Sequence, residues 1–395
     1  MRSQELLWKI PYGTKDLLPQ AAAGKRAIEE KLAAMFRRWG YDEVITPTME
    51  FLDTFTKGDT EKREAGLYKF FDRSNQILAL RSDMTTPIAR VAASRLKDAP
   101  TPLKLCYVDN VFRYEQAQAG RQCEFYQAGV ELLGIPDASA DAEVIAIAVE
   151  SLRQAGLPNF RISLGQVDFI NGIMEASGLT DGEIERVKSA MVHQDLVGLD
   201  AILEATSITD DMKNLIRQIP LLRGGEEILN EVYQKVKNAK SRAALTNLAE
   251  IYRLLACYGV EKEIHFDLGI IRDFDYYTGM VFEGYAPGLG FPICGGGRYD
   301  QMLKSFGTDC PATGFSVGIE RIMLSLERQG LATDLRQKDV YIGWQHGKMP
   351  DAIREANRLR VEGLCAELGM TPQSKEQAEQ CQQDKGYTRL VYIEG

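Results

Sequence analysis

Two polar side chains, Gln127 and Glu131, lie four positions apart in the stretch 125–133. In a β-strand this spacing places Gln127 and Glu131 on one face with Phe125 and Gly129, and apolar residues on the other face. This polar row would face something other than the apolar core. The alternative explanation is a sheet with one solvated face, which is the simpler one for an isolated strand.

Charged residues flank a long loop just before this stretch. Arg113 and Glu115 precede residues 116–124, a connection longer than the roughly two to five residues that are usual in a hairpin. Long loops are often functional. We therefore expect Arg113 and Glu115 to lie at the mouth of a site.

A Gly-x-Ser-x-Gly sequence at 314–318 matches the nucleophile elbow of serine hydrolases. Its triad could be completed only by His346, the one histidine that follows Ser316, and the alternating βα units of a hydrolase are not evident. A serine hydrolase acting through Ser316 is therefore a remote alternative. We expect the two glycines to allow tight packing between a strand and a helix instead.

Composition excludes several classes of protein. The 395 residues carry 47 Lys and Arg against 56 Asp and Glu, and the net charge of −9 disfavours non-specific nucleic-acid binding. The seven cysteines never form C-x-x-C and the three histidines are far apart, which argues against a disulfide framework or a metal site. No stretch approaches the roughly 18 apolar residues of a membrane span. We expect a cytoplasmic protein with no membrane association, bound metal or cofactor.

The periodicity of apolar residues predicts an α+β fold. Apolar residues recur at helical spacing in 20–39 and in 141–154. Between these two predicted helices lie short β-prone runs, which are joined by loops rather than by crossover helices. This arrangement indicates antiparallel strands. Helical spacing then dominates residues 169–260. The further expected elements are strands at 77–81, 104–113, 125–133, 265–270, 276–285, 314–317, 340–344 and 390–393, and helices at 319–328 and 351–368.

These elements suggest a core interrupted by an insertion. The expected parts are a first core segment (1–168), a mainly helical insertion (169–262), a second core segment (263–330) and a truncated α/β C-terminal segment (331–395).

Five segments, in order, resemble motifs of the class II aminoacyl-tRNA synthetases. Segments 38–50, 112–125 and 311–321 are similar to the three class motifs, and segments 272–283 and 295–300 are similar to sequences peculiar to the histidyl-tRNA synthetases. The resemblance covers about residues 11–328. It implies the class II synthetase core, an antiparallel sheet flanked by helices, and a self-dimer through the first motif.

The resemblance also implies a histidine pocket. Asp83 and Thr85 would take the ammonium group, and Gln127 and Glu131 would complete the amino-acid site. Cations would hold the carboxylate and phosphate groups, because two anions approach each other only when neutralised. The implied histidine-binding residues are Asp83, Thr85, Arg113, Gln127, Glu131, Arg272, Tyr276 and Tyr277, with Tyr276 and Tyr277 beside the imidazole. A residual nucleotide-phosphate site would comprise Glu115, Arg121 and Arg321.

The chain departs from a synthetase in two places. Only 65 residues follow Gly330, where histidyl-tRNA synthetases carry a complete anticodon-binding domain, and residues 331–395 have a net charge of −1. Gln116 and Cys123 stand in the loop where synthetases usually have an Arg-Pro-Gln run and a second arginine. A histidine pocket with such a loop resembles the regulatory subunits of ATP phosphoribosyltransferase, as do segments 11–19 and 80–85.

Membership of that regulatory family would imply a protein with no catalytic residues. It would assemble with a short-form ATP phosphoribosyltransferase catalytic subunit as a hetero-oligomer, bind L-histidine as the effector, and control the first step of histidine biosynthesis. It would not bind tRNA. The alternative is a histidine-tRNA ligase that carries out ATP-dependent aminoacylation.

Overall fold

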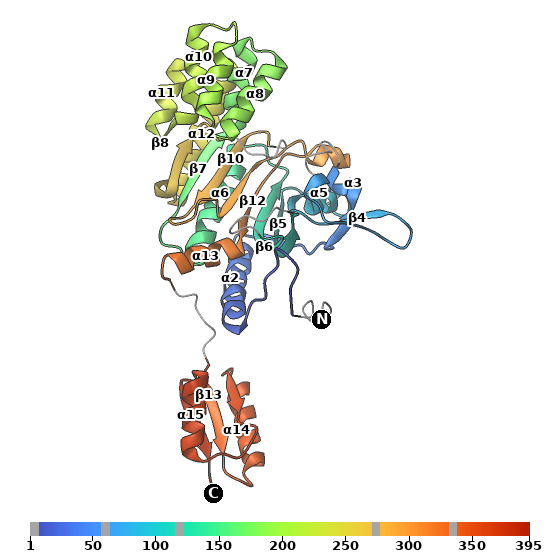
Figure 1. Cartoon of the computed structure of the whole chain (residues 1–395), viewed down its shortest axis with the longest axis vertical. Coiled ribbons are helices and arrows are strands. Elements are labelled where there is room, and N and C mark those ends of the chain that lie inside the picture. Colours follow the sequence, from blue (N-terminus) through green and yellow to red (C-terminus); the bar gives the residue numbers. More distant parts are fainter. Residues whose placement is uncertain (1–7, 57–63, 115–121, 271–276, 332–337) are drawn as a thin grey trace. The chain divides into compact units, whose positions relative to one another are not determined.

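The computed structural model describes residues 8–56, 64–114, 122–270, 277–331 and 338–395. The chain divides into two compact units, Met1–Thr333 and Asp334–Gly395. The larger unit contains the elements that form the candidate site (Figure 1).

A nine-stranded sheet, in the order β1-β5-β6-β12-β11-β10-β7-β9-β8, forms the centre of the larger unit. β1 with β5 and β7 with β9 pair in parallel, and the other neighbours are antiparallel, as expected for an α+β protein. The strands are β1 (Asp42–Glu43), β5 (Leu103–Phe112), β6 (Glu124–Leu133), β7 (Arg161–Gln166), β8 (Arg223–Gly224), β9 (Ile264–Asp267), β10 (Met280–Tyr285), β11 (Cys294–Arg298) and β12 (Ala312–Gly318).

One face of this sheet is covered by helices. α2 (Pro19–Arg38), α6 (Ala138–Gln154) and α13 (Ile319–Arg328) pack on β6 and its neighbours. Val130 of β6 and Phe315 of β12 point into this layer and belong to the main apolar core. The alternation within β6 therefore gives one face to the core and leaves the other face for the site.

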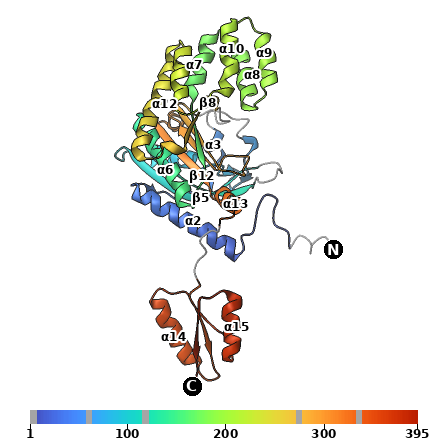
Figure 2. The same ribbon diagram turned by 90° about the vertical axis from the view of Figure 1, so that its left-hand side faces the viewer.

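A helical insertion joins β7 to β9. Its apolar residues face inward at helical spacing, as the sequence predicts, and Figures 1 and 2 show its helices gathered as one cluster beyond β7. The elements are α7 (Val167–Ser177), α8 (Asp181–Val192), α9 (Leu196–Glu204), α10 (Asp210–Gln218), the 3₁₀ turn η1 (Ile219–Leu221), β8, α11 (Glu227–Lys235), α12 (Ala239–Tyr258) and the 3₁₀ turn η2 (Glu261–Glu263).

The opposite face of the main sheet carries a second, smaller core. It contains Met84, Ile88, Tyr107 and Leu303, and it packs α5 (Thr85–Ser94) against the sheet. A separate three-stranded sheet, in the order β2-β4-β3, precedes α5 along the chain. The remaining elements here are β2 (Met49–Phe51), α3 (Leu52–Thr56), β3 (Lys69–Phe71), β4 (Ile77–Leu80) and the 3₁₀ turn η3 (Leu303–Phe306).

The unit Asp334–Gly395 is a three-stranded parallel sheet in the order β14-β13-β15 with two helices. The sequence-based helix at 351–368 is wrong in its last part. The helix ends before Gly363, which has a φ of +84°, and residues 366–368 form a strand. The elements are β13 (Val340–Trp344), α14 (Met349–Val361), β14 (Ala366–Leu368), α15 (Lys375–Lys385) and β15 (Arg389–Ile393).

Two strands of the larger unit are shorter than the sequence predicts. β9 ends at Asp267 rather than continuing to Ile270, because the Asp267 carboxylate accepts a hydrogen bond from the Gly269 amide at 3.1 Å and turns the chain. β10 begins at Met280. None of the described helices is long and apolar enough to cross a bilayer.

Candidate functional site

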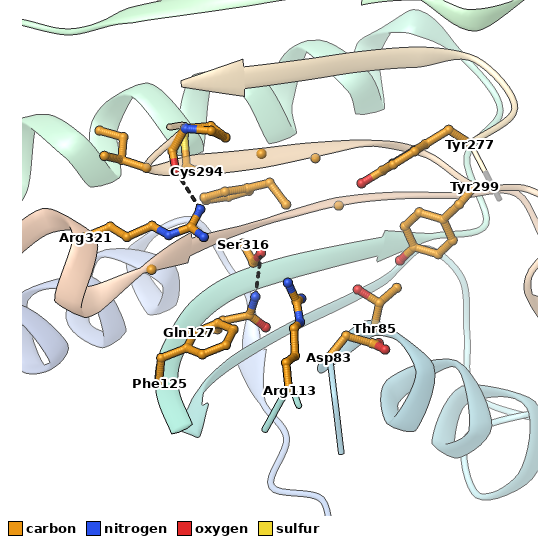
Figure 3. A pocket seen from close by; sticks show the side chains of 17 residues that line it. Asp83, Thr85, Arg113, Phe125, Gln127, Tyr277, Cys294, Tyr299, Ser316 and Arg321 are labelled. Carbon is orange, nitrogen blue, oxygen red and sulfur yellow. Dashed lines mark hydrogen bonds between the residues drawn. The ribbon is translucent and has the colours of Figure 1, made fainter. Parts of the chain in front are cut away.

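A pocket opens on the face of the main sheet that carries α5 (Figure 3). Its walls come from segments far apart in the sequence: the turn before α5, the ends of β5 and β6, and strands β11 and β12. The lining residues are Asp83, Thr85, Arg113, Phe125, Gln127, Tyr277, Pro292, Ile293, Cys294, Gly295, Gly296, Tyr299, Gly314, Phe315, Ser316, Gly318 and Arg321.

The floor of the pocket exists because β12 carries a glycine where it passes Glu131. Gly314 pairs with Glu131 in the register of β12 and β6. A Cβ atom at Gly314 would lie 1.8 Å from the Glu131 Oε2 atom, which is far inside van der Waals contact. The expectation that Gly314 serves strand-to-helix packing is therefore wrong, because it makes room for a carboxyl group.

Glu131 is the buried polar centre beneath the pocket, with 1% of its surface exposed. Its Oε1 atom accepts a hydrogen bond from the Thr85 hydroxyl at 2.8 Å, and its Oε2 atom accepts one from the Tyr299 hydroxyl. Burial raises the pKa of the Glu131 carboxyl to about 8, although both hydrogen bonds lower it. Its protonation therefore changes near neutral pH.

Asp83 lies on the turn that begins α5. Its Oδ1 atom accepts a hydrogen bond from the Thr86 amide at 2.7 Å, so the carboxylate is fixed at the N-terminus of the helix. Its Oδ2 atom accepts one from the Ser82 hydroxyl at 3.3 Å. The turn thus presents a negative group to the pocket.

Arg113 extends from the end of β5 toward the same space (Figure 3). Its Nε atom donates to the Ser82 carbonyl at 2.9 Å, and its guanidinium lies 5.2 Å from the centre of the Phe125 ring. A cation and a carboxylate, those of Arg113 and Asp83, therefore line one pocket.

Gln127 and Ser316 meet across β6 and β12. The Gln127 amide Nε2 atom donates to the Ser316 hydroxyl at 3.3 Å. Ser316 lies inside a strand with antiparallel neighbours on both sides, not at a strand-to-helix turn. The nucleophile-elbow interpretation is therefore wrong.

Arg321 closes the other end of the pocket from the first turn of α13. It donates to the Pro292 carbonyl at 2.6 Å and lies 5.2 Å from the centre of the Phe291 ring. Cys123 does not line the pocket. Its amide donates to the Gly13 carbonyl at 2.7 Å and its sulfur packs against Gly13.

The structure brings together most of the residues named from the sequence. Asp83, Thr85, Arg113, Gln127, Tyr277 and Arg321 line the pocket, and Glu131 lies beneath it. The residues Glu115, Arg121, Arg272 and Tyr276 lie outside the described residues. No three potential metal-ligating side chains gather among the residues described.

Two tyrosines were missed as site residues. Tyr299 supplies a donor to Glu131, and Tyr107 is buried below Gly129 on the pocket face of β5. The strand pattern of residues 104–113 could have indicated the orientation of Tyr107. No local signal connects Tyr299 to Glu131, because they meet only through the order of β11, β12 and β6.

Comparison with known proteins relates this chain to a family. A family profile described as histidyl-tRNA synthetase matches residues 13–322. A protein of Moorella thermoacetica named ATP phosphoribosyltransferase regulatory subunit is 47% identical over 317 residues, which are 80% of this chain and 82% of that protein. One of Desulforamulus reducens with the same name is 41% identical over 388 residues, which are 98% of this chain and 96% of the relative. This chain belongs to the ATP phosphoribosyltransferase regulatory subunit family.

Solved structures agree with this family membership. A crystal structure from Bacillus halodurans, described as an ATP phosphoribosyltransferase regulatory subunit/histidyl-tRNA synthetase, is 32% identical with a TM-score of 0.87, and the match covers 98% of this chain and 99% of that one. Histidyl-tRNA synthetase from Nostoc sp. PCC 7120 is 22% identical with a TM-score of 0.84, over 97% of this chain and 91% of that one. The regulatory subunit family therefore shares the class II synthetase fold that the sequence motifs predict.

Proposed function

We propose that this chain is the histidine-sensing, non-catalytic subunit of an ATP phosphoribosyltransferase, and that L-histidine binds in the pocket described above. The observation that carries the proposal is the convergence of groups complementary to each part of the ligand. The Asp83 carboxylate suits the ammonium group, and the Arg113 guanidinium suits the carboxylate. Gln127, Tyr277 and the buried Glu131 suit the imidazole.

The protonation of Glu131 supports an imidazole ligand. A carboxyl group with a pKa of about 8 is available near neutral pH both as an O–H donor and as an acceptor. It can donate to a neutral imidazole or accept from an imidazolium ion, so the pocket accommodates either form of the ring. Arg272 and Tyr276, which follow from the family resemblance, complete the proposed set.

Calorimetry with L-histidine tests the pocket. Asp83→Asn should weaken binding by roughly tenfold to a hundredfold, because a charged hydrogen-bond partner is removed. Asp309→Asn is the matched control, since its exposed carboxylate pairs with Lys304 and does not line the pocket. Absence of histidine binding by the wild-type chain, or equal weakening in both variants, would contradict the proposal.

Regulation requires a partner that carries out the chemistry. We propose that this partner is a short-form ATP phosphoribosyltransferase catalytic subunit that needs this chain for activity, and the names of the relatives support the pairing. Phosphoribosyl transfer to ATP by the reconstituted complex should fall as histidine rises. Glu131→Ala or Arg272→Ala should relieve that inhibition while size-exclusion chromatography still shows assembly. Inhibition that is unchanged in both assembled variants would place the effector site elsewhere.

A histidine-tRNA ligase is the second candidate. It is favoured by the synthetase profile over 13–322 and by Arg321 at the far end of the pocket, where a nucleotide phosphate would lie. We propose instead that the chain does not bind tRNA, since residues 331–395 hold nine basic and ten acidic side chains. A tRNA-charging assay separates the candidates: robust charging that depends on Arg113 would favour the ligase.

We also propose a self-dimer within the hetero-oligomer. The segment after α2, which resembles the first synthetase motif, exposes three large apolar side chains, Ile45, Met49 and Phe51. Exposed apolar groups of this size in one segment are typical of a contact surface. Sedimentation of the purified chain should show a dimer, and Phe51→Asp should shift it toward the monomer. A wild-type monomer at micromolar concentration would contradict this proposal.

A further inference from the structure

Among the described residues, Arg81 is the largest of the fully buried side chains, with 1% of its surface exposed, and it lies outside the pocket. It immediately precedes Ser82 and Asp83, which form the turn into α5. A buried guanidinium is costly unless every donor has a partner. The partners of Arg81 therefore show what this charge holds in place.

Every nitrogen of the Arg81 side chain has a partner, and these partners lie on two other parts of the fold. Nε donates to the Asn110 carbonyl at 2.7 Å, and Nη2 donates to the Asn110 side-chain oxygen at 2.9 Å and pairs with Asp109. Nη1 donates to the Thr46 carbonyl at 2.8 Å and contacts the Thr46 hydroxyl at 3.4 Å. One guanidinium thus ties the end of β5 to the segment before β2.

The backbone of Arg81 is equally constrained. Its amide donates to the Thr48 carbonyl at 3.0 Å, and its carbonyl accepts from the Phe112 amide at 2.8 Å. The next carbonyl, that of Ser82, accepts from Arg113 Nε at 2.9 Å. The contacts of Arg81 therefore set the separation between the turn that carries Asp83 and the strand end that carries Arg113.

We infer that Arg81 is a positioning residue that aligns the Asp83 carboxylate with the Arg113 guanidinium for an amino-acid ligand. This inference rests on the proposed histidine pocket and adds to it a residue that never touches the ligand. The planar, forked guanidinium is essential to the role, because a lysine ammonium cannot reach Asn110, Asp109 and Thr46 in the same geometry.

Ligand discrimination tests the inference. L-histidine, L-histidinol, which lacks the carboxylate, and imidazolepropionate, which lacks the ammonium group, are titrated calorimetrically into wild type and Arg81→Lys. We expect histidine affinity to fall roughly tenfold to a hundredfold in Arg81→Lys. The affinity for each analogue should fall less than the affinity for histidine, because an analogue contacts only one of the two misaligned charged side chains. The preference of the wild-type protein for histidine over both analogues should shrink accordingly.

Two further variants separate positioning from stability. Asp109→Asn removes the negative charge that pairs with Arg81 at a half-buried position, and it should shrink the preference in the same direction, even where Arg81→Lys does not fold. Leu248→Ala is the control: it opens a cavity in α12 of the insertion, lowers the melting temperature and should leave all three affinities unchanged.

The outcomes distinguish the two proposals. Wild-type protein that does not bind histidine overturns the pocket itself. If the wild-type protein binds histidine but Arg81→Lys keeps the same preference for histidine over both analogues, only the role of Arg81 is overturned. Where Arg81→Lys does not fold, the same criterion applies to Asp109→Asn. Equal losses of affinity for all three ligands, or a matching loss of affinity in Leu248→Ala, also overturn the role of Arg81. General destabilisation of the fold would then be sufficient to explain the weaker binding.

Discussion

Tyr299 donates its hydroxyl hydrogen to Glu131 across an intervening strand, in a space left by Gly314. Tyr299 follows β11 and Glu131 lies on β6, so β12 runs between them. The same carboxyl group accepts from Thr85 at the start of α5. The Glu131 carboxyl group, through these two hydrogen bonds, therefore joins three of the segments that surround the pocket.

Tyr299→Phe should raise the pKa of the Glu131 carboxyl above its value of about 8, because the lost hydrogen bond lowers that pKa in the wild-type protein. NMR titration of glutamate labelled at the carboxyl carbon measures the shift. Tyr341→Phe is the control, because it also removes the hydroxyl of a buried tyrosine but lies in the other unit, whereas Tyr299 lines the pocket. An unchanged titration in Tyr299→Phe would contradict the contact.

The raised pKa of Glu131 also predicts how stability depends on pH. The folded-state pKa of about 8 lies above the usual 4.5, so the protonated group favours folding. This contribution is complete below about pH 4.5 and is lost as the pH rises through 8. Glu131→Gln lacks it, so the melting temperature of Glu131→Gln relative to wild type should increase from pH 5 to pH 8. A difference that is flat with pH would show that Glu131 titrates normally.

Gly314→Ala should abolish the pocket while changing only one methyl group. The added Cβ atom would meet both the Glu131 carboxyl group and the Val130 carbonyl, at 1.8 and 2.6 Å, so the strands must separate or Glu131 must move. We expect a melting temperature several degrees lower, from an overpacking cost of about 1–3 kcal/mol, and loss of histidine binding. Gly290→Ala, where a Cβ atom would meet nothing within 4 Å, is the control. Binding equal to wild type in Gly314→Ala would disprove the steric argument.

The buried pair Arg298–Asp141 should couple the strand before Tyr299 to α6. Arg298 Nη2 lies 2.9 Å from the Asp141 carboxylate, and Nη1 donates to the Ile135 carbonyl at 3.1 Å. Arg298→Met leaves a buried carboxylate without its cation and should cost about 3–5 kcal/mol. Arg298→Met combined with Asp141→Leu should cost less than Arg298→Met alone. Chemical denaturation of the single and double variants measures this, and additive losses would rule out the coupling.

Ser374→Ala tests the second unit separately. The Ser374 hydroxyl accepts from the Gln377 amide at 3.2 Å, and the Gln377 side chain accepts from the Ser374 amide at 2.9 Å, which forms a capping box. Loss of the cap should destabilise this unit by about 1 kcal/mol. Denaturation followed by the buried Trp344, with Trp8 and Trp39 replaced by Phe, reports on it. Histidine affinity should not change, and a change would indicate that the two units are coupled.

Local periodicity predicted much of the fold but not all of it. The alternation in β6 correctly separates the core face from the pocket face, since Val130 joins the core and Gln127 lines the pocket. Helix α15 (Lys375–Lys385) was missed because only Ala378 among its residues is buried, so no apolar period marks it. The end of α14 was missed because apolar residues continue past Gly363 into β14.

The candidate site depended on the family resemblance more than on local pattern. Asp83 lies in the turn before α5 and Thr85 is the first residue of that helix. No diagnostic periodicity marks either position, and only the motif resemblance identified them. Tyr299 and Glu131 are 168 residues apart in sequence, and their contact depends on the order of the strands in the sheet. Such pairings are fixed by the topology of the whole sheet, and single-sequence patterns contain no information about them.

The floor of the pocket forms because two positions are glycine and carry no side chain. Gly314 faces Glu131, and Gly129 on β6 would place a Cβ atom 2.2 Å from the Phe315 carbonyl. Every glycine codon is one base change from an alanine codon. A single nucleotide substitution at either position is therefore enough to fill the space, whereas restoring it requires that same base to revert. The pocket is in this sense easily lost by mutation, and the two codons are where naturally occurring variants that lack the proposed histidine site should be sought.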